Sequence, residues 1–292
     1  MKTLNKTVIA LALATALPTA ALAVDVPLLD VVFNPSAVAG AGLATTGFFF
    51  DEIVFSSVNS STLTLTDADL DGVIGAGQGE TFKEAGLIIN TNFKFDGLLV
   101  APGTSGTNVS YQMFAVFDPT LIAGTGLSGT AGLFGPTLLA LFDSTSAAHI
   151  VIDTGALNGV YDPASSFTIG KLTLGAGNCV LTPAIGGTFA EGSCGLSFAF
   201  DAGGVTDAGV WTRGGEDLGN LNASVSLNVD VDSITPPLSL VYAGGAGSTQ
   251  TTSLIHDGST AFAVAVPEPA SLALLGIGLL GMGGLMRRRH AA

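Results

Sequence analysis

The chain has 292 residues, of which 48% are hydrophobic and 11% are charged, and its formal net charge is −14 at pH 7. Because nine Lys and Arg residues face 23 Asp and Glu residues, the charge argues against a nucleic-acid partner, whose phosphates need basic groups to neutralise them. Divalent cations and neutral or cation-bridged acidic polymers suit this charge better.

Residues 1–23 have the organisation of a secretory signal peptide. Lys2 and Lys6 flank the start of the apolar run VIALALATAL, and Ala21-Leu22-Ala23 forms a small-x-small cleavage pattern. We therefore expect export across the inner membrane and removal of this segment. Residues 24–265 are predicted to form the extracellular domain, in which four basic residues face 22 acids, a formal charge of −18.

The predicted domain reads as all-β, because Thr, Ser, Val, Phe and Gly are abundant and helix-like runs are almost absent. The clearest strand is 221–232, LNASVSLNVDVD, where apolar and polar residues alternate strictly. Such alternation suits an antiparallel sheet with one wet face, so the predicted fold is an antiparallel β-sandwich, jelly-roll-like. Length permits one large sandwich or two small ones.

Weaker strand signals are separated by turns rich in Gly and Pro. They lie at 48–56, 62–66, 87–95, 109–117, 137–142, 150–152, 167–174, 196–200, 238–242 and 261–266. Two glycine-rich segments, 37–47 and 124–135, are predicted to be flexible loops.

Residues 67–74, DADLDGVI, have the spacing of metal ligands. Asp67, Asp69 and Asp71 occupy the first, third and fifth positions and Gly72 the sixth, as in the first half of an EF-hand-type calcium loop. Three aspartates within five residues repel one another unless a cation or water separates them. The alternative is an acidic surface turn closed by the glycine.

The second half of this loop departs from the EF-hand pattern. Gln78 stands at the twelfth position and cannot supply a bidentate carboxylate. We predict that Ca²⁺ is bound at the surface by the three aspartates and the Val73 carbonyl, with Glu80 reaching back in place of the missing acid. The flanking segments read as strands, so a helix-loop-helix pair is not expected.

The two cysteines, Cys179 and Cys194, enclose a Gly-rich stretch in a chain bound for an oxidising compartment. We predict one disulfide, with free thiols, a metal pair or a catalytic cysteine as the alternatives. His149 and His256, the histidines of the predicted domain, are not near either cysteine in sequence.

The sequence contains no G-x-S-x-G elbow, no H-E-x-x-H pair and no glycine-rich phosphate loop of the G-x-x-x-x-G-K-[ST] type. Asp230 with Asp232, or Glu216 with Asp217, could be imagined as the paired carboxylates of a glycoside hydrolase. Neighbouring acids of this kind are more often solvated surface. The sequence therefore predicts a protein that is not an enzyme.

The last segment, 266–292, has three parts in a fixed order. Pro267-Glu268-Pro269 is followed by the uncharged run 270–286 and then by Arg287, Arg288 and Arg289. As a helix the run spans roughly 25 Å, enough for a thin bilayer core, and the arginines keep the end in the cytoplasm. A plain C-terminal anchor or a buried core helix are the alternatives.

This order closely resembles the PEP-CTERM signal of bacteria, which an integral-membrane exosortase recognises and processes. The resemblance implies an exported protein of a Gram-negative bacterium, held in the membrane by a single transmembrane helix at 270–286 until processing. Its destination would be the cell surface or an exopolysaccharide-rich extracellular matrix.

The body resembles flocculation-associated PEP-CTERM proteins at several short segments: Asn34-Pro35, GAGL at 40–43, FDEI at 50–53, ETF at 80–82, EAG at 84–86 and the 111–117 strand. This resemblance implies a structural matrix protein that helps cells aggregate, in biofilms or flocs, with exopolysaccharide or other surface glycans as partners. A calcium-dependent carbohydrate-binding module and a secreted glycan-active hydrolase remain the alternatives.

Overall fold

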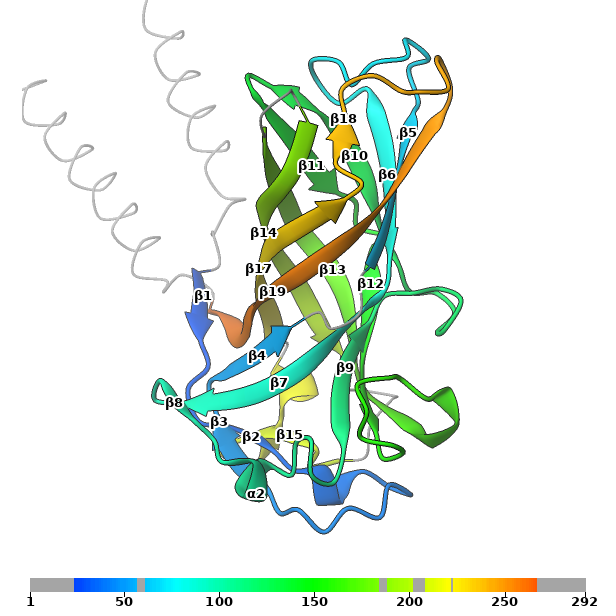
Figure 1. Cartoon of the computed structure of the whole chain (residues 1–292). Coiled ribbons are helices and arrows are strands. Elements are labelled where there is room, and N and C mark those ends of the chain that lie inside the picture. Colours follow the sequence, from blue (N-terminus) through cyan, green and yellow to red (C-terminus); the bar gives the residue numbers. More distant parts are fainter. Residues whose placement is uncertain (1–23, 57–60, 184–187, 202–207, 222, 267–292) are drawn as a thin grey trace, which may run out of the picture. The chain divides into compact units, whose positions relative to one another are not determined.

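The computed structural model describes residues 24–56, 61–183, 188–201, 208–221 and 223–266 (Figure 1). One compact unit is Pro27–Val264, and the other combines Met1–Val26 with Ala265–Ala292. The signal peptide 1–23 and the helix 270–286 lie outside the described residues, and they stay predictions, as does the domain range 24–265.

The predicted all-β, antiparallel class is confirmed. The helical elements are short: η1 (Pro35–Ala37), α2 (Pro102–Ser105), η2 (Pro163–Ser165) and η3 (Leu218–Leu221). The strands are β1 (Val24–Pro27), β2 (Val31–Phe33), β3 (Phe48–Phe50), β4 (Glu52–Ser56), β5 (Ser61–Asp67), β6 (Glu80–Ala85), β7 (Leu87–Phe95), β8 (Leu98–Leu99), β9 (Gln112–Val116), β10 (Leu127–Phe134), β11 (Thr137–Phe142), β12 (Ala147–Asp153), β13 (Ser166–Pro183), β14 (Thr188–Asp201), β15 (Trp211–Arg213), β16 (Glu216–Asp217), β17 (Ala223–Thr235), β18 (Leu238–Ser239) and β19 (Thr249–Val266).

The main sheet of the Pro27–Val264 unit closes on itself twice. In the β4 ring, antiparallel pairing runs through β4, β7, β9, β12, β13, β14, β17, β19 and back to β4. In the β5 ring, β5, β6, β10 and β11 close against the same long strands β13, β14, β17 and β19. Opposed walls therefore face each other across a core, as in a sandwich, and β19 crosses from one ring to the other (Figure 1).

Each ring has its own apolar core. The core at the β5 ring contains Leu65, Phe82 and Tyr242. The core at the β4 ring is aromatic and includes residues of the small sheet β16-β15-β2-β3. At its centre, Trp211 stacks on Phe33 with ring centroids 4.4 Å apart, and its indole N–H donates to the Ile169 carbonyl at 2.5 Å.

The clearest predicted strand is present as β17. Val225, Val229 and Val231 are buried, whereas Asp230 and Asp232 are exposed. The predicted alternation therefore identifies the inward and outward faces, and the two aspartates lie on the wet face as expected.

The prediction of a flexible loop at 124–135 is wrong, because β10 occupies Leu127–Phe134. Two glycines in this strand allow close backbone approach. A Cβ on Gly129 would lie 2.0 Å from the Leu141 carbonyl oxygen, and one on Gly132 would lie 1.2 Å from the Gly77 carbonyl oxygen. These glycines are needed for close packing of the backbone. A prediction from glycine content alone mistakes them for the glycines of a flexible loop.

Strand β6 was not predicted, because its inward face carries two acids. Glu80, Phe82 and Glu84 are buried, while the residues between them are exposed. The period of two is present, but buried carboxylates hide it from a hydrophobicity pattern. Both acids have partners within the fold, as described below.

We expect His149 to make folding stability depend on pH. It lies on β12 opposite Lys171 of β13, and burial together with the lysine charge lowers the pKa of the imidazole below its ordinary 6.5. The unfolded chain therefore binds a proton more readily than the folded one, so stability should be lost as pH falls below about 6.5.

Denaturant midpoints at pH 7 and pH 5 test this expectation. The decrease in midpoint should be smaller in His149→Gln than in the wild type, since glutamine cannot take up the proton. Comparing the two proteins cancels the contribution of every other titrating group. Equal decreases would show that the imidazole does not contribute.

Candidate functional site

The candidate site lies in the connection between β5 and β6. Asp67 ends β5, Glu80 begins β6, and the register of the pair places these two residues directly opposite each other. The twelve intervening residues are held by bridges from Val73 to Val241 and from Ala76 to Leu133. Antiparallel pairing thus brings together two acids that are distant in sequence.

Four carboxylates converge at this point. Asp67, Asp69, Asp71 and Glu80 each offer an oxygen, and these oxygens all lie within 4.8 Å of one another. Asp67 and Glu80 are buried, whereas Asp69 and Asp71 are exposed. The prediction that the whole site lies at the surface is therefore wrong. Its first and last acids are buried, because they belong to the paired strands β5 and β6. Negative groups at this spacing repel strongly unless a proton or a cation lies among them.

Backbone amides hold the Asp67 carboxylate in place. Its Oδ1 accepts from the N–H groups of Leu70 and Asp71, at 2.9 and 3.3 Å, and its Oδ2 accepts from Gly72 and Gly247, at 2.9 and 2.7 Å. Burial raises the pKa of this carboxyl, but the amides outweigh burial and the net shift is downward. Asp67 is therefore ionised and fixed in orientation.

The pKa of Asp69 is shifted in the opposite direction. Although the residue is exposed, partial desolvation of its carboxyl, a hydrogen bond shared with Asp67 and the charge of Asp71 raise this pKa above its ordinary 3.8. The two neighbouring aspartates compete for one proton when nothing else separates them. A cation would replace that proton.

Glu80 was predicted as a ligand, but its burial and its hydrogen bond to Tyr242 were not. Its side chain is fully buried, and its Oε2 accepts from the Tyr242 hydroxyl at 2.9 Å. Its Oε1 makes no hydrogen bond within the described part of the chain. Burial raises the pKa of this carboxyl. A buried, unpartnered carboxylate oxygen inside a carboxylate cluster is the arrangement that a bound cation would satisfy.

These four residues could hold a metal ion, and the donor set suits a hard cation that prefers oxygen ligands. Gln78 does not join the cluster, and its Nε2 donates to the Leu139 carbonyl at 3.5 Å. Val73 donates its N–H to Asp71 Oδ1 at 2.9 Å. Ligation by the Val73 carbonyl stays a prediction.

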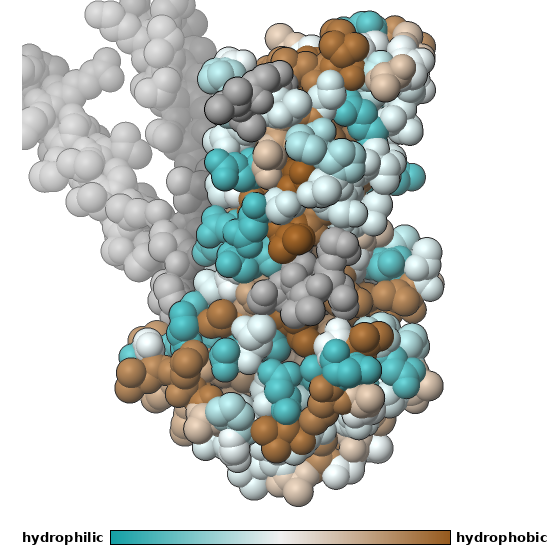
Figure 2. All heavy atoms as spheres, viewed as in Figure 1, coloured by the Kyte–Doolittle hydropathy of each residue, from teal (hydrophilic) through white to brown (hydrophobic). Residues whose placement is uncertain are grey.

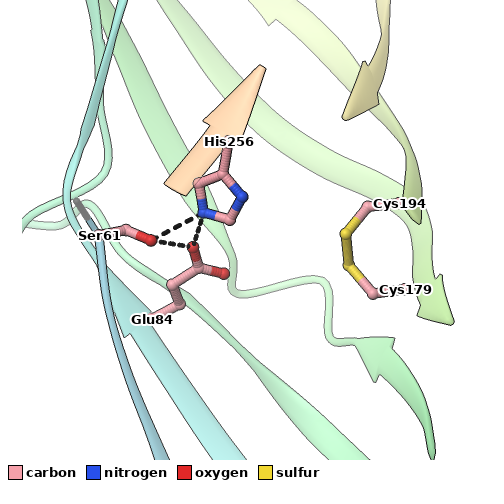
Figure 3. Close-up of a disulfide and its surroundings, with 5 residues drawn as sticks. All are labelled: Ser61, Glu84, Cys179, Cys194 and His256. Carbon is pink, nitrogen blue, oxygen red and sulfur yellow. Dashed lines mark hydrogen bonds and ion pairs between the residues drawn. A yellow bond between two sulfur atoms is a disulfide. The ribbon is translucent and has the colours of Figure 1, made fainter. Parts of the chain in front are cut away.

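The predicted disulfide is present. Cys179 and Cys194 are register partners on β13 and β14, and the bond closes this hairpin where both strands serve both rings. Figure 3 shows it beside a second feature that the sequence did not reveal, a buried cluster of Ser61, Glu84 and His256.

The buried cluster joins β5, β6 and β19 where the two rings meet. The Ser61 hydroxyl donates to Glu84 Oε1 at 2.6 Å, and His256 Nε2 lies 2.8 Å from Ser61 Oγ and 2.9 Å from Glu84 Oε1 (Figure 3). In a hydrolytic triad, the acid and the nucleophile contact different ring nitrogens. Here both contact Nε2, and Nδ1 has no hydrogen-bond partner in the described residues. The arrangement lacks triad geometry and links the three strands.

Comparison with known proteins identifies the C-terminal segment. Residues 265–289 match the PEP-CTERM protein-sorting motif. No curated protein and no solved structure matches the chain. The fold and the motif together define an exported, all-β protein of the cell surface or extracellular space. The chain carries a PEP-CTERM protein-sorting motif, the signal by which an exosortase recognises its substrates.

The sorting residues themselves are not described by the structure. Pro267, Glu268, Pro269 and the arginines 287–289 lie beyond its last described residue, Val266. Within the described ranges, no helix has the length and apolar character needed to cross a membrane.

Proposed function

We propose that this chain is a calcium-stabilised structural protein of the cell surface or extracellular matrix, where it associates with exopolysaccharide and helps cells to aggregate. The Glu80 Oε1 oxygen carries the proposal, since it is buried among four converging carboxylates and makes no hydrogen bond to any residue that the structure describes. The calcium ligands are side-chain oxygens of Asp67, Asp69, Asp71 and Glu80. The Val73 carbonyl is the fifth ligand that the protein supplies.

Calcium fits the location as well as the donor set. It takes six to eight oxygen ligands in flexible geometry, and extracellular modules typically bind it at about 10⁻⁴–10⁻³ M. Asp67 contacts Gly247 and Glu80 contacts Tyr242, so the ion ties the β5–β6 connection to the segment that leads into β19. External calcium would thereby strengthen one end of the β5 ring.

A gene deletion tests the proposed role in aggregation. Cells without the protein should make the same amount of polysaccharide but fail to form flocs. Complementation with Asp69→Ala/Asp71→Ala should not restore flocs, because the loss of two exposed oxygen ligands weakens calcium binding while leaving the buried acids in place.

Asp230→Ala/Asp232→Ala is the matched control. It removes the same charge from exposed positions outside the cluster and should restore flocs like the wild type. Unchanged flocs after deletion would contradict the matrix role. Equal behaviour of the two double variants would separate aggregation from the calcium site.

A calcium-dependent carbohydrate-binding module is the second candidate. The exposure of Asp69 and Asp71 favours it, because an ion held there keeps a side open to solvent, where sugar hydroxyls could become ligands. Saturable binding of the host polysaccharide that EDTA abolishes would support it. Binding that EDTA leaves unchanged would count against it.

A further inference from the structure

The β7–β8 hairpin presents two leucines to solvent. Asp96 and Gly97 have φ values of 51° and 74°, as the two-residue type I′ hairpin turn requires. The register pairs Phe95 with Leu98 and Lys94 with Leu99. Leu98 is 73% exposed and Leu99 is 63% exposed. In Figure 2, brown spheres gather over β8.

Two further apolar side chains lie at the same end of the β4 ring. Phe49 is 54% exposed, and its ring centroid is 5.9 Å from that of Phe95 in the hairpin. Leu29 is 59% exposed and follows Leu28, whose N–H donates to the Phe262 carbonyl at 2.8 Å. We call Leu29, Phe49, Leu98 and Leu99 the apolar tip.

The apolar tip lies near the C-terminal end of β19, where the compact unit ends at Val264. Thr260 of β19 pairs with Ile53 of β4, and the adjacent Glu52 pairs with Lys94 of β7, the register partner of Leu99. The last residues of β19, the start of β4, the end of β7 and the β7–β8 hairpin therefore lie side by side in the sheet.

The remaining length of chain determines what can cover this surface. The unit ends at Val264, and the uncharged run of the sorting segment begins at Ala270. The five residues between them span at most roughly 18 Å when fully extended. While the run 270–286 lies in the bilayer, the exit point of β19 must therefore stay close to the membrane surface.

We infer that the apolar tip contacts the outer surface of the lipid bilayer and seats the precursor there while its C-terminal segment is anchored. The inference rests on the anchoring step of the proposed export route. The contact is apolar, since the acidic body would be repelled by anionic lipid. Exposed leucine and phenylalanine side chains bury their apolar surface at the boundary between lipid headgroups and acyl chains.

The opposite end of β19 supplies a matched control position. Leu70 is 65% exposed, and its loop is tied to the start of β19 by the hydrogen bond from Asp67 N to the Ser248 carbonyl. The strand segment from residue 248 to 262 spans roughly 45 Å. Leu70 should therefore remain in water when the apolar tip contacts lipid.

Site-directed fluorescence on the full chain tests the inference. Leu99→Cys and Leu70→Cys are each labelled with an environment-sensitive dye, which the cysteines of the Cys179–Cys194 disulfide do not take up. The chains are reconstituted in phosphatidylcholine vesicles with nitroxide-labelled lipid. The dye at position 99 should shift to shorter wavelength and be quenched several-fold more strongly than the dye at position 70.

The possible outcomes distinguish the lipid contact of the apolar tip from anchoring by the C-terminal segment. Chains that float with the vesicles but show equal quenching at both positions would overturn the contact alone. Chains that fail to float would contradict anchoring, and the inference with it. Leu98→Cys provides a second labelling position on the same hairpin. Its dye should be quenched as strongly as the dye at position 99, and quenching no stronger than at position 70 would contradict the contact.

Discussion

Replacing Trp211 by alanine is expected to destabilise the protein by about 3–5 kcal/mol, the usual cost of removing a buried aromatic side chain. Trp211 is 1% exposed and lies against Phe33, Phe50, Phe200 and Phe262, with ring centroids 4.4 to 5.9 Å away. Its removal leaves a cavity among rings that belong to both the small sheet and the β4 ring. It also leaves the Ile169 carbonyl without its donor.

Urea unfolding followed by circular dichroism measures this loss. Because domains of this kind are stable by only about 5–15 kcal/mol, the variant should unfold at a much lower urea concentration or be partly unfolded in buffer. Trp211→Phe keeps a ring in the same place and should cost less. An alanine variant with the wild-type midpoint would show that the aromatic cluster is not central to the fold.

The second large effect concerns processing. Replacing Glu268 by alanine, or deleting residues 287–289, should leave unprocessed precursor in the membrane fraction. The first change disturbs the motif that the exosortase reads, and the second removes the positive charges that set the orientation of the segment. Immunoblots of membrane and extracellular fractions measure both effects.

Glu216→Ala is the matched control for the acid substitution. It removes one acid from the exposed strand β16 of the body and should be processed as the wild type. Normal maturation of the Glu268 and tail variants would show that the C-terminal segment is a plain membrane anchor.

Local pattern was sufficient for much of the strand assignment. Strands β7 and β11 begin and end at the predicted residues, because glycine or an aspartate turn interrupts the pattern near each end. Closure of the two rings was not predictable in this way. It depends on β19 pairing with β4 and β5, segments nearly 200 residues earlier, and no local signal specifies such partners.

The candidate site shows the same division. The spacing of Asp67, Asp69 and Asp71 was sufficient to predict a metal site, because the three residues lie within five positions of one another. The contributions of Tyr242 and Gly247 arise only when the segment between β18 and β19 folds onto that turn. The cluster of Ser61, Glu84 and His256 was missed for the same reason, since its three members come from separate strands.

Thermal melting with and without calcium tests the central claim most directly. With calcium at ten times its dissociation constant, the folded state should gain about 1.4 kcal/mol by mass action, so the wild type should melt at a higher temperature in millimolar calcium than in EDTA. Asp69→Ala/Asp71→Ala, which removes two oxygen ligands, should show no such difference, and Asp230→Ala/Asp232→Ala should retain it. A wild type that melts at the same temperature in EDTA and in calcium would contradict the proposal that this cluster binds calcium.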